Sequence, residues 1–234
     1  MVRGQRDSLY FEWLGADFDR FMSDYDVTRR SWLIAREIGR LGGLTRKQVL
    51  EVGCGTGRIS KMIAECGCRL TVNDISPRLT AAVSAKIGCA GIPGDCLQLP
   101  LADSSFDAVI SSECIEHTQA PYDAVREMYR VLRPGGPLVL TTPNKLWYPI
   151  LWLSERFGVR KFRGIEHWTW PREMRVFLHS LGFRHVRFSG CHLLPWQIPF
   201  AKEWLPLADR VGEQLYPVMI NYLASGTKGD GVRA

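Results

Sequence analysis

The fold is decided by the stretch Val49-Leu50-Glu51-Val52-Gly53-Cys54-Gly55-Thr56-Gly57 of this 234-residue chain. Its apolar first half predicts a buried strand, and its closely spaced glycines predict a turn that leads into a helix. Glycine lets the backbone pass near a ligand where a side chain would collide. The N-terminus of the following helix offers free N–H groups and a positive dipole end. The stretch therefore predicts a ligand-binding turn at the carboxyl end of a strand.

Strand-like and helix-like segments alternate beyond this turn. The predicted strands are 69–73, 106–112, 137–142, 184–189 and 218–225, and the predicted helices are 58–66, 76–88, 121–133 and 171–180. Such alternation predicts an α/β fold with a doubly wound, mostly parallel sheet. No helix is evident between the last two strands, which predicts an antiparallel edge. We expect a single domain over 1–234, with 1–44 as a helical N-terminal extension.

The composition excludes several classes of protein. Hydrophobic residues make up 46% of the chain, and no apolar run is long enough to cross a bilayer. The first residues lack the apolar stretch of a signal peptide. The seven cysteines include no pair of CxxC clusters, so we expect no metal site and reduced thiols in the cytoplasm. The net charge of +6 comes without a nucleic-acid-binding motif, so we do not expect a nucleic-acid partner.

Three acids follow successive strands and indicate the kind of ligand. The glycines at 53, 55 and 57 do not fit the GxGxxG spacing of dinucleotide sites, and Glu51 suits a ligand with a cationic end. S-adenosylmethionine (SAM) carries an ammonium and a sulfonium. Asp74 lies where an acid accepts hydrogen bonds from ribose hydroxyls, and Asp95 could accept from an adenine amino group. Taken alone, each acid is more often a turn or helix-cap residue, but all three in register with the glycine turn favour a ligand site.

Several motifs together resemble one family, the class I SAM-dependent methyltransferases, and in particular the ubiquinone-biosynthesis O-methyltransferase branch. The resemblance covers roughly residues 45–190. It rests on VLEVGCGTG (49–57), VNDIS (72–76), GDCLQLPLADSSFDAVISSECIEH (94–117), LRPGGPLVLTTPN (132–144) and the stretch 179–183. It implies a Rossmann-like, seven-stranded sheet whose last strand is antiparallel.

The resemblance also implies a SAM site. Around the methionine part of SAM it places Glu51, Gly53 and Gly55, with the loop residues Cys54 and Gly57. Asp74 would bind the ribose, and Ser112 would lie beside the sulfonium. The residues around the adenine would be Ile75, Asp95 and Cys96. The family's N-terminal residues that cover SAM have no clear counterpart here. Tyr25 and Arg29 are the candidates.

Methyl transfer to a hydroxyl needs a general base, whereas transfer to carbon or nitrogen need not. His117 is our candidate, because it lies in a segment that resembles the family's IEH motif. A purely structural role at a helix start is the alternative. Glu113, Glu116 and Glu166 are further candidates, and we expect His167 to be structural.

Two aromatic insertions, 145–170 and 191–217, are expected to lie over the acceptor site. They hold six of the eight tryptophans, and within 145–163 Leu146, Ile150 and Leu153 share a helical face opposite basic residues. One interpretation is that these helices cover the domain's own core. The other is a pocket for a hydrophobic acceptor, with peripheral membrane contact through 145–163. The ubiquinone-type relatives act on prenylated lipids and carry a membrane-facing insertion at this point.

The sequence thus predicts a cytoplasmic SAM-dependent methyltransferase, with peripheral membrane association as an open alternative. It would methylate a hydrophobic small-molecule or lipid-linked acceptor, on oxygen. The alternatives are a nicotinamide-dependent Rossmann oxidoreductase and a non-catalytic SAM-binding module. The glycine spacing and Glu51 argue against the first, and the complete set of donor-site residues argues against the second.

Overall fold

The computed structural model describes residues 23–156, 166–193 and 211–230. Seven strands form one sheet in the order β3-β2-β1-β4-β5-β7-β6. Their bounds are β1 (Gln48–Val52), β2 (Arg69–Asp74), β3 (Ala90–Pro93), β4 (Ala108–Ser112), β5 (Pro137–Pro143), β6 (Phe183–Cys191) and β7 (Asn221–Lys228). The first five strands run parallel, whereas β7 pairs antiparallel with both β5 and β6. The predicted doubly wound sheet with an antiparallel last strand is confirmed.

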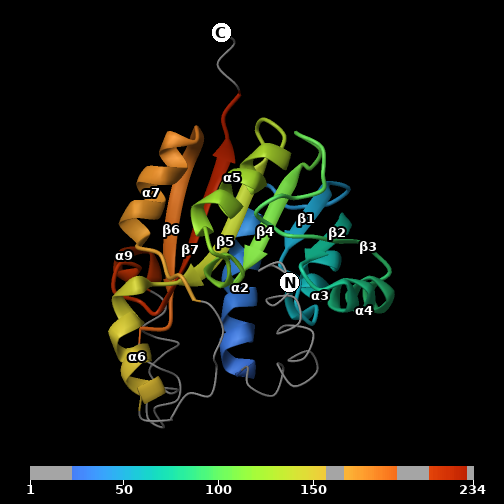
Figure 1. Cartoon of the computed structure of the whole chain (residues 1–234). Helices are drawn as coiled ribbons and strands as arrows, with labels where there is room; N and C mark the ends of the chain where they lie inside the picture. The colour runs from blue at the N-terminus through green and yellow to red at the C-terminus, as the bar shows by residue number, and fades with distance from the viewer. Residues whose placement is uncertain (1–22, 157–165, 194–210, 231–234) are drawn as a thin grey trace.

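Helices cover both faces of this sheet (Figure 1). They are α2 (Asp24–Arg40), α3 (Arg58–Ala64), α4 (Pro77–Ile87), α5 (Pro121–Val131), α6 (Tyr148–Arg156), α7 (Pro171–Ser180) and α9 (Gly212–Leu215), with 3-10 turns η1 (Ile115–His117) and η2 (Lys145–Trp147). Side chains of α5 and α7 join one core cluster, and those of α2, α3 and α4 join the other. Alternation along β1 feeds both clusters, because Leu50 and Val52 face the first and Val49 faces the second.

Most boundaries follow the local signals in the sequence. Ser76 caps α4, since its side chain accepts a hydrogen bond from the Leu79 amide, and Gly88 ends the helix in a left-handed conformation. The predicted N-terminal helix lies partly outside the described residues. Within them, α2 runs from Asp24 to Arg40 and packs against the second core cluster.

The predicted last strand began at residue 218, but β7 begins at Asn221. The backbone before it makes other hydrogen bonds. The Val218 amide donates to Leu215, and the Val218 carbonyl accepts from the Trp147 indole across 2.9 Å. Asn144 donates to the carbonyls of Pro217 and Met219. Side chains from the region after β5 therefore replace the sheet ladder over these residues.

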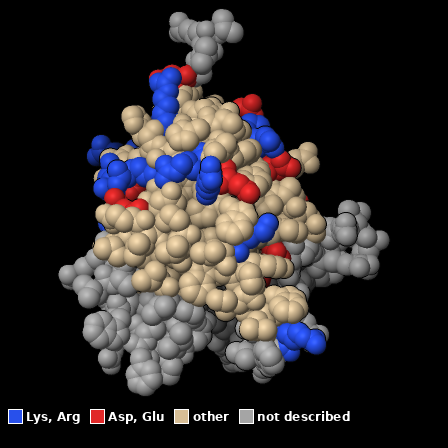
Figure 2. Space-filling view, turned by 90° about the vertical axis from the view of Figure 1, so that its left-hand side faces the viewer, with Lys and Arg blue, Asp and Glu red and all other residues tan. Residues whose placement is uncertain are grey.

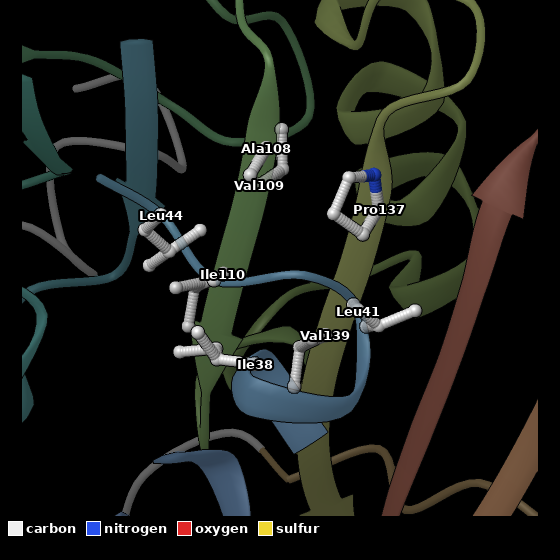
Figure 3. Close-up of a pocket in the computed structure, with 9 residues that line it drawn as sticks. Ile38, Leu41, Leu44, Ala108, Val109, Ile110, Pro137 and Val139 are labelled. Carbon is white, nitrogen blue, oxygen red and sulfur yellow. The ribbon is translucent and has the colours of Figure 1, made fainter. Parts of the chain in front are cut away.

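A small apolar pocket lies between the end of α2 and the sheet (Figure 3). Ile38 and Leu44 line it on the helical side, and Ala108 and Pro137 line it on the strands. Ala108 and Pro137 are the first residues of β4 and β5, so the pocket is at the amino edge of the sheet. Ligands of open α/β sheets bind at the carboxyl edge. The candidate site is therefore elsewhere.

Candidate active site

The turn between β1 and α3, here called the glycine loop (residues 53–57), has a backbone that favours glycine at three positions. Gly53, Gly55 and Gly57 have φ angles of 77°, 51° and 82°. The amides of Gly53 and Cys54 both donate to the Asn73 carbonyl of β2 across 2.9 Å. The loop is thus bonded to the neighbouring strand while it leads the chain into α3.

The three glycines have different surroundings. A Cβ at Gly53 would lie 2.4 Å from the Cys114 sulfur, and one at Gly57 would lie 3.0 Å from Val83. A Cβ at Gly55 would meet no atom of the described residues within 4 Å. Gly53 and Gly57 are therefore required by packing inside the protein. Gly55 borders open space, which is the kind of cradle that a closely approaching ligand needs.

Glu51 is a buried acid at the edge of this cradle. Its side chain is buried, and Oε2 has no hydrogen-bond partner within the described part of the chain. Burial raises the pKa of Glu51 to about 8, the Ser60 hydroxyl opposes this shift and the Asp74 carboxylate adds to it. An unpartnered buried carboxyl costs free energy unless a cation or donor binds to it. The environment of Glu51 fits the ammonium-bearing end of SAM.

Asp74 ends β2 and bonds the glycine loop directly. Its Oδ2 accepts from the Gly55 amide across 2.9 Å, and its Oδ1 accepts from the Ser76 amide across 3.0 Å. Burial raises the pKa of Asp74, although these two amides lower it. Each carboxylate oxygen has a second lone pair, so the backbone bonds leave acceptor capacity for ribose hydroxyls.

The residues expected around the adenine lie beside Asp74. The Gly94 amide donates to the Asp74 carbonyl across 2.9 Å, which holds the end of β3 against the end of β2. Asp95 is exposed, and its side chain accepts a hydrogen bond from the backbone amide of Leu97, as a turn-capping acid does. Cys96 is buried and Ile75 is half-buried. The structure brings these residues together at one edge, next to the glycine loop.

Ser112 ends β4 and contacts a buried ion pair from α2. Its hydroxyl lies 3.0 Å from the Thr141 hydroxyl and 3.3 Å from an Arg30 nitrogen. Arg30 donates to both carboxylate oxygens of Asp26, across 3.0 and 2.6 Å. His192, just after β6, lies 2.9 Å from the same carboxylate. Residues from α2, β4, β5 and β6 thus meet at the carboxyl edge.

Sequence reasoning missed Arg30 and Asp26. The candidates predicted from the sequence are Tyr25 and Arg29. The ring of Tyr25 packs against the ring of His192, with 5.6 Å between the ring centroids, and the Arg29 guanidinium lies over the exposed Trp32 ring. An Asp and an Arg four residues apart in a predicted helix are a salt-bridge signal that could have indicated the pair.

The segment after β4, here called the acceptor loop (residues 113–117), holds the candidate bases. Glu113 has a φ of 51° and its Oε2 accepts from the Asn221 amide group across 2.7 Å. Glu116 is buried and accepts from the Thr142 hydroxyl across 3.2 Å. Burial raises the pKa of both carboxyls. Asp26 raises the pKa of Glu113 further, whereas Arg30 lowers it, and Glu113 raises the pKa of Glu116. His117 ends the loop and is half-buried.

His167 joins the second half of the first insertion to this loop. Its Nδ1 donates to the Thr118 carbonyl across 2.7 Å, and its backbone amide donates to the Glu116 carbonyl across 2.7 Å. These bonds are structural, as expected for His167. In residues 23–156, 166–193 and 211–230, no group of three or more His, Cys, Asp or Glu residues is placed to hold a metal ion.

The glycine cradle, the buried unpartnered acid and the two further acids lie at successive strand ends, where the sequence predicts a SAM site. Residues 50–140 match a family model described as "Methyltransferase domain". Residues 50–140 thus form a methyltransferase domain. This match agrees with the predicted class I SAM-dependent methyltransferase family and with SAM as the methyl donor, and the predicted Rossmann-like fold is confirmed.

Two curated relatives illustrate the similarity of this methyltransferase. A malonyl-[acyl-carrier protein] O-methyltransferase of Enterobacter lignolyticus is 36% identical over 106 residues, 45% of this chain and 42% of the relative. A ubiquinone biosynthesis O-methyltransferase of Xanthomonas axonopodis pv. citri is 28% identical over 162 residues, 64% of this chain and 68% of the relative. The chain thus spans less than half the length of the first relative.

Solved structures share the fold over a longer range. A methyltransferase from a complex with the Haloferax volcanii Trm112 activator has a TM-score of 0.68 at 22% identity, covering 98% of this chain and 100% of that chain. Phosphoethanolamine N-methyltransferase 2 of Haemonchus contortus, solved with SAM, has a TM-score of 0.63 at 16% identity, covering 86% of this chain and 52% of that chain.

Proposed function

We propose that this methyltransferase transfers the methyl group of SAM to an oxygen of a hydrophobic small-molecule or lipid-linked acceptor. When bound, SAM supplies an activated methyl group on a sulfonium. In the transfer, the acceptor oxygen forms a bond to the methyl carbon while the carbon–sulfur bond breaks, and its electron pair stays on sulfur. The protein has to align the two reactants and exclude water.

Donor binding is assigned to the residues around the glycine loop. Glu51 and the cradle at Gly55 would hold the methionine part, with Cys54 and Gly57 shaping the loop. Asp74 would bind the ribose hydroxyls. Asp95, Cys96 and Ile75 would surround the adenine, and Ser112 would lie beside the sulfonium. This assignment is supported by the positions of these residues at one edge of the sheet.

His117 is proposed to remove the proton of the acceptor hydroxyl. It ends the acceptor loop, which directly follows Ser112 at the end of β4. A base placed there would face the oxygen that receives the methyl group. General bases typically contribute about 10²–10⁴-fold to the rate.

The observation that supports a hydrophobic acceptor is the exposed apolar surface of η2 and α6. Leu146, Ile150, Trp152 and Leu153 are 43%, 55%, 56% and 48% exposed. This segment directly follows β5, and Figure 1 shows α6 at the end of the sheet to which the arrowhead of β5 points. Large apolar side chains gathered on a surface mark a binding site or a membrane contact. The segment is therefore suited to receive an apolar molecule beside the acceptor loop.

The same surface supports peripheral membrane contact through 145–163. Figure 2 shows Lys, Arg and acidic residues gathered across the upper half of this side of the molecule, with a largely uncharged described surface below. No described helix has the length and apolar character needed to span a membrane. The basic residues Arg160, Lys161 and Arg163 lie outside the described residues. Docking by α6 would bring the acceptor loop to a lipid-soluble substrate.

The experiment that tests the proposed function uses SAM with a deuterated methyl group. Lipid and aqueous extracts are incubated with the protein, and mass spectrometry searches for compounds that gain 17 mass units, one CD₃ in place of a hydrogen. We expect the labelled product in the lipid extract, and its label to be lost under conditions that cleave methyl ethers. A label confined to polar products would contradict a hydrophobic acceptor, and a label stable to ether cleavage would contradict oxygen.

A further inference from the structure

Glu113 in the acceptor loop and Asn221 each keep one buried acceptor atom without a donor among the described residues. Asn221 donates through Nδ2 to Glu113 Oε2 across 2.7 Å, which fixes the two side chains against each other. The other oxygen of each, Glu113 Oε1 and Asn221 Oδ1, is buried and has no hydrogen-bond partner within the described part of the chain. Buried polar atoms without partners are uncommon because each loses its bonds to water. Two of them on one bonded pair indicate that a ligand supplies the missing donor.

The pair is placed at the expected site of methyl transfer. Glu113 follows Ser112 directly, and the next residue, Cys114, is the one whose sulfur would lie 2.4 Å from a Cβ at Gly53. The acceptor loop and the glycine loop are therefore in contact. Asn221 is the first residue of β7 and pairs with Pro143 and Cys191, the last residues of β5 and β6. Both members of the pair thus lie at the carboxyl edge of the sheet.

The backbone of Glu113 points to the same conclusion. Its φ of 51° is uncommon for a residue other than glycine. The Glu113 amide is held by the Thr141 carbonyl across 3.0 Å. A strained conformation persists only where the surroundings impose it, and such residues cluster at functional sites. The strain here places a carboxyl side chain next to Asn221 instead of in solvent.

The charges around the pair select the kind of group that it can bind. Glu113 interacts electrostatically with Arg30 and Asp26, and Glu116 of the same loop interacts with Glu113. Arg30 is already bonded to both oxygens of Asp26. An incoming carboxylate would therefore meet two unpartnered acceptor atoms and neighbouring acids, while the guanidinium nitrogens of Arg30 are bonded to Asp26 and Ser112. A hydroxyl group, which oxygen methylation also requires, offers a proton that one of these oxygens can accept.

We propose that Glu113 and Asn221 bind the polar group of the methyl acceptor, and that this group is a hydrogen-bond-donating hydroxyl and not a carboxylate. The inference rests on the proposed function, which it deepens by naming the class of group recognised. Glu113 and Asn221 are binding residues in it, and proton removal stays with His117.

The test compares three probes built on a twelve-carbon chain, which in dodecanoate includes the carboxylate carbon. Dodecyl gallate offers phenolic hydroxyls, dodecylamine offers an amine and dodecanoate offers a carboxylate. Their dissociation constants are measured below their critical micelle concentrations, with and without saturating S-adenosylhomocysteine. We expect dodecyl gallate to bind at least tenfold more tightly than dodecanoate. Equal or tighter binding of dodecanoate overturns the proposal, and tightest binding of dodecylamine overturns the choice of a hydroxyl.

The variants Glu113→Gln and Asn221→Leu test the pair itself. Glu113→Gln places an N–H₂ donor where Asn221 or the ligand needs an acceptor, so the preference for dodecyl gallate should fall about ten- to a hundredfold. Glu37→Gln is the matched control, because Glu37 is also buried but accepts from Ser225 in the middle of the sheet. It should keep the preference.

Binding of S-adenosylhomocysteine separates this inference from the proposed function. If the parent protein does not bind it by calorimetry, the proposed function fails, whereas a probe preference that depends on Glu113 would still support the pair as a hydroxyl site. If Glu113→Gln binds S-adenosylhomocysteine more than tenfold more weakly than the parent, the pair belongs to the donor site and the inference is wrong. Unfolding temperatures of all variants show which are folded, and a preference unchanged in folded Glu113→Gln also overturns it.

Discussion

The Asp74 carboxylate accepts a hydrogen bond from the Gly55 amide across 2.9 Å, so the acid at the end of β2 holds the glycine loop. The same carboxylate accepts from the Ser76 amide at the start of α4. Asp74 therefore fixes two backbone segments as well as facing the expected ribose. A change at Asp74 should affect the shape of the site and ligand binding together.

Asp74→Ala should weaken binding of SAM about tenfold or more. The substitution removes the ribose partner and leaves the amides of Gly55 and Ser76 without an acceptor, a loss of about 1–3 kcal/mol for each buried group. Asp74→Asn keeps one carbonyl oxygen, so its affinity should fall between those of the parent and Asp74→Ala. Calorimetry with S-adenosylhomocysteine measures both. Unchanged affinity in Asp74→Ala would remove Asp74 from the site.

Gly53→Ala and Gly55→Ala should fail in different ways. Both glycines have a positive φ, which costs an alanine about 1–2 kcal/mol in either case. At Gly53 the new methyl group would collide with Cys114, so the unfolding temperature should fall further there. At Gly55 the methyl group would contact none of the residues that the structure describes, so the variant should fold but bind SAM more weakly.

Thermal unfolding and calorimetry on these two variants distinguish protein packing from ligand contact. A Gly55→Ala protein that binds SAM as tightly as the parent would show that the space beside Gly55 is not the ligand cradle. A Gly53→Ala protein as stable as Gly55→Ala would show that the acceptor loop moves away from the glycine loop at little cost.

Glu51 should make the ligand-free protein less stable as pH rises. The folded pKa of Glu51 is about 8, above the ordinary value of 4.5, so between these pH values the folded protein keeps a proton that the unfolded chain has released. The contribution of Glu51 to the free energy of unfolding is therefore fully present below about pH 4.5. It is lost as the pH rises towards 8. Urea unfolding of the parent and Glu51→Gln at pH 5.5 and 7.5 measures it, and the difference between the two pH values should be smaller in Glu51→Gln.

Binding of SAM should show the opposite dependence on pH. A cationic group favours ionised Glu51, so SAM should bind more tightly at pH 7.5 than at pH 5.5 and should release a proton on binding. Calorimetry in two buffers of different ionisation enthalpy counts that proton. No proton release by the parent, or the same release by Glu51→Gln, would show that Glu51 does not face the cationic end of SAM.

The donor half of the site could be predicted from sequence because its residues are local. Glu51, the glycine loop and Asp74 each lie at the end of a strand whose apolar pattern is plain, and parallel strands bring those ends to one edge. The strands and helices from β1 to α7 follow from the same local signals. Two strands begin later than predicted. β4 begins at Ala108 instead of residue 106, and β7 begins at Asn221 because side chains of Asn144 and Trp147 bond the preceding backbone.

The acceptor half could not be predicted in the same way because its contacts join distant parts of the chain. Asn221 and Glu113 are 108 residues apart, and His192 and Asp26 are 166 residues apart. An antiparallel pairing of β5 with β7 creates the first contact, and the packing of α2 over the sheet creates the second. No local pattern in either partner indicates the other.

His117→Ala should lower turnover about 10²–10⁴-fold while SAM affinity stays within twofold of the parent, because a general base acts in the chemical step. His179→Ala is the matched control, since His179 is exposed on α7 and should leave both quantities unchanged. Turnover is measured with deuterated SAM and the acceptor found in the extract experiment. Parallel loss of SAM affinity and unfolding temperature in His117→Ala would assign His117 a structural role.

Removing apolar side chains from α6 should abolish binding to membranes. Ile150 and Trp152 are 55% and 56% exposed, so changing both to serine should leave the fold intact. Burial of each side chain in a bilayer interface would contribute about 1.5–3 kcal/mol, and each nearby Lys or Arg about 1 kcal/mol on an anionic surface. The double variant should therefore sediment with anionic phosphatidylglycerol vesicles at least tenfold less than the parent.

Val176→Ser and an Arg156, Arg160 and Arg163 triple-glutamate variant complete the membrane experiment. Val176 is 65% exposed but lies on α7, so its loss should not change sedimentation. The triple variant should lose binding at low salt, and high salt should release much of the parent, because exposed charges are screened within about 10 Å at 0.1 M salt. Both effects require that apolar and basic groups act at one surface. If the parent stays in the supernatant at low salt, there is no membrane contact, and the apolar side chains of α6 serve only the acceptor site.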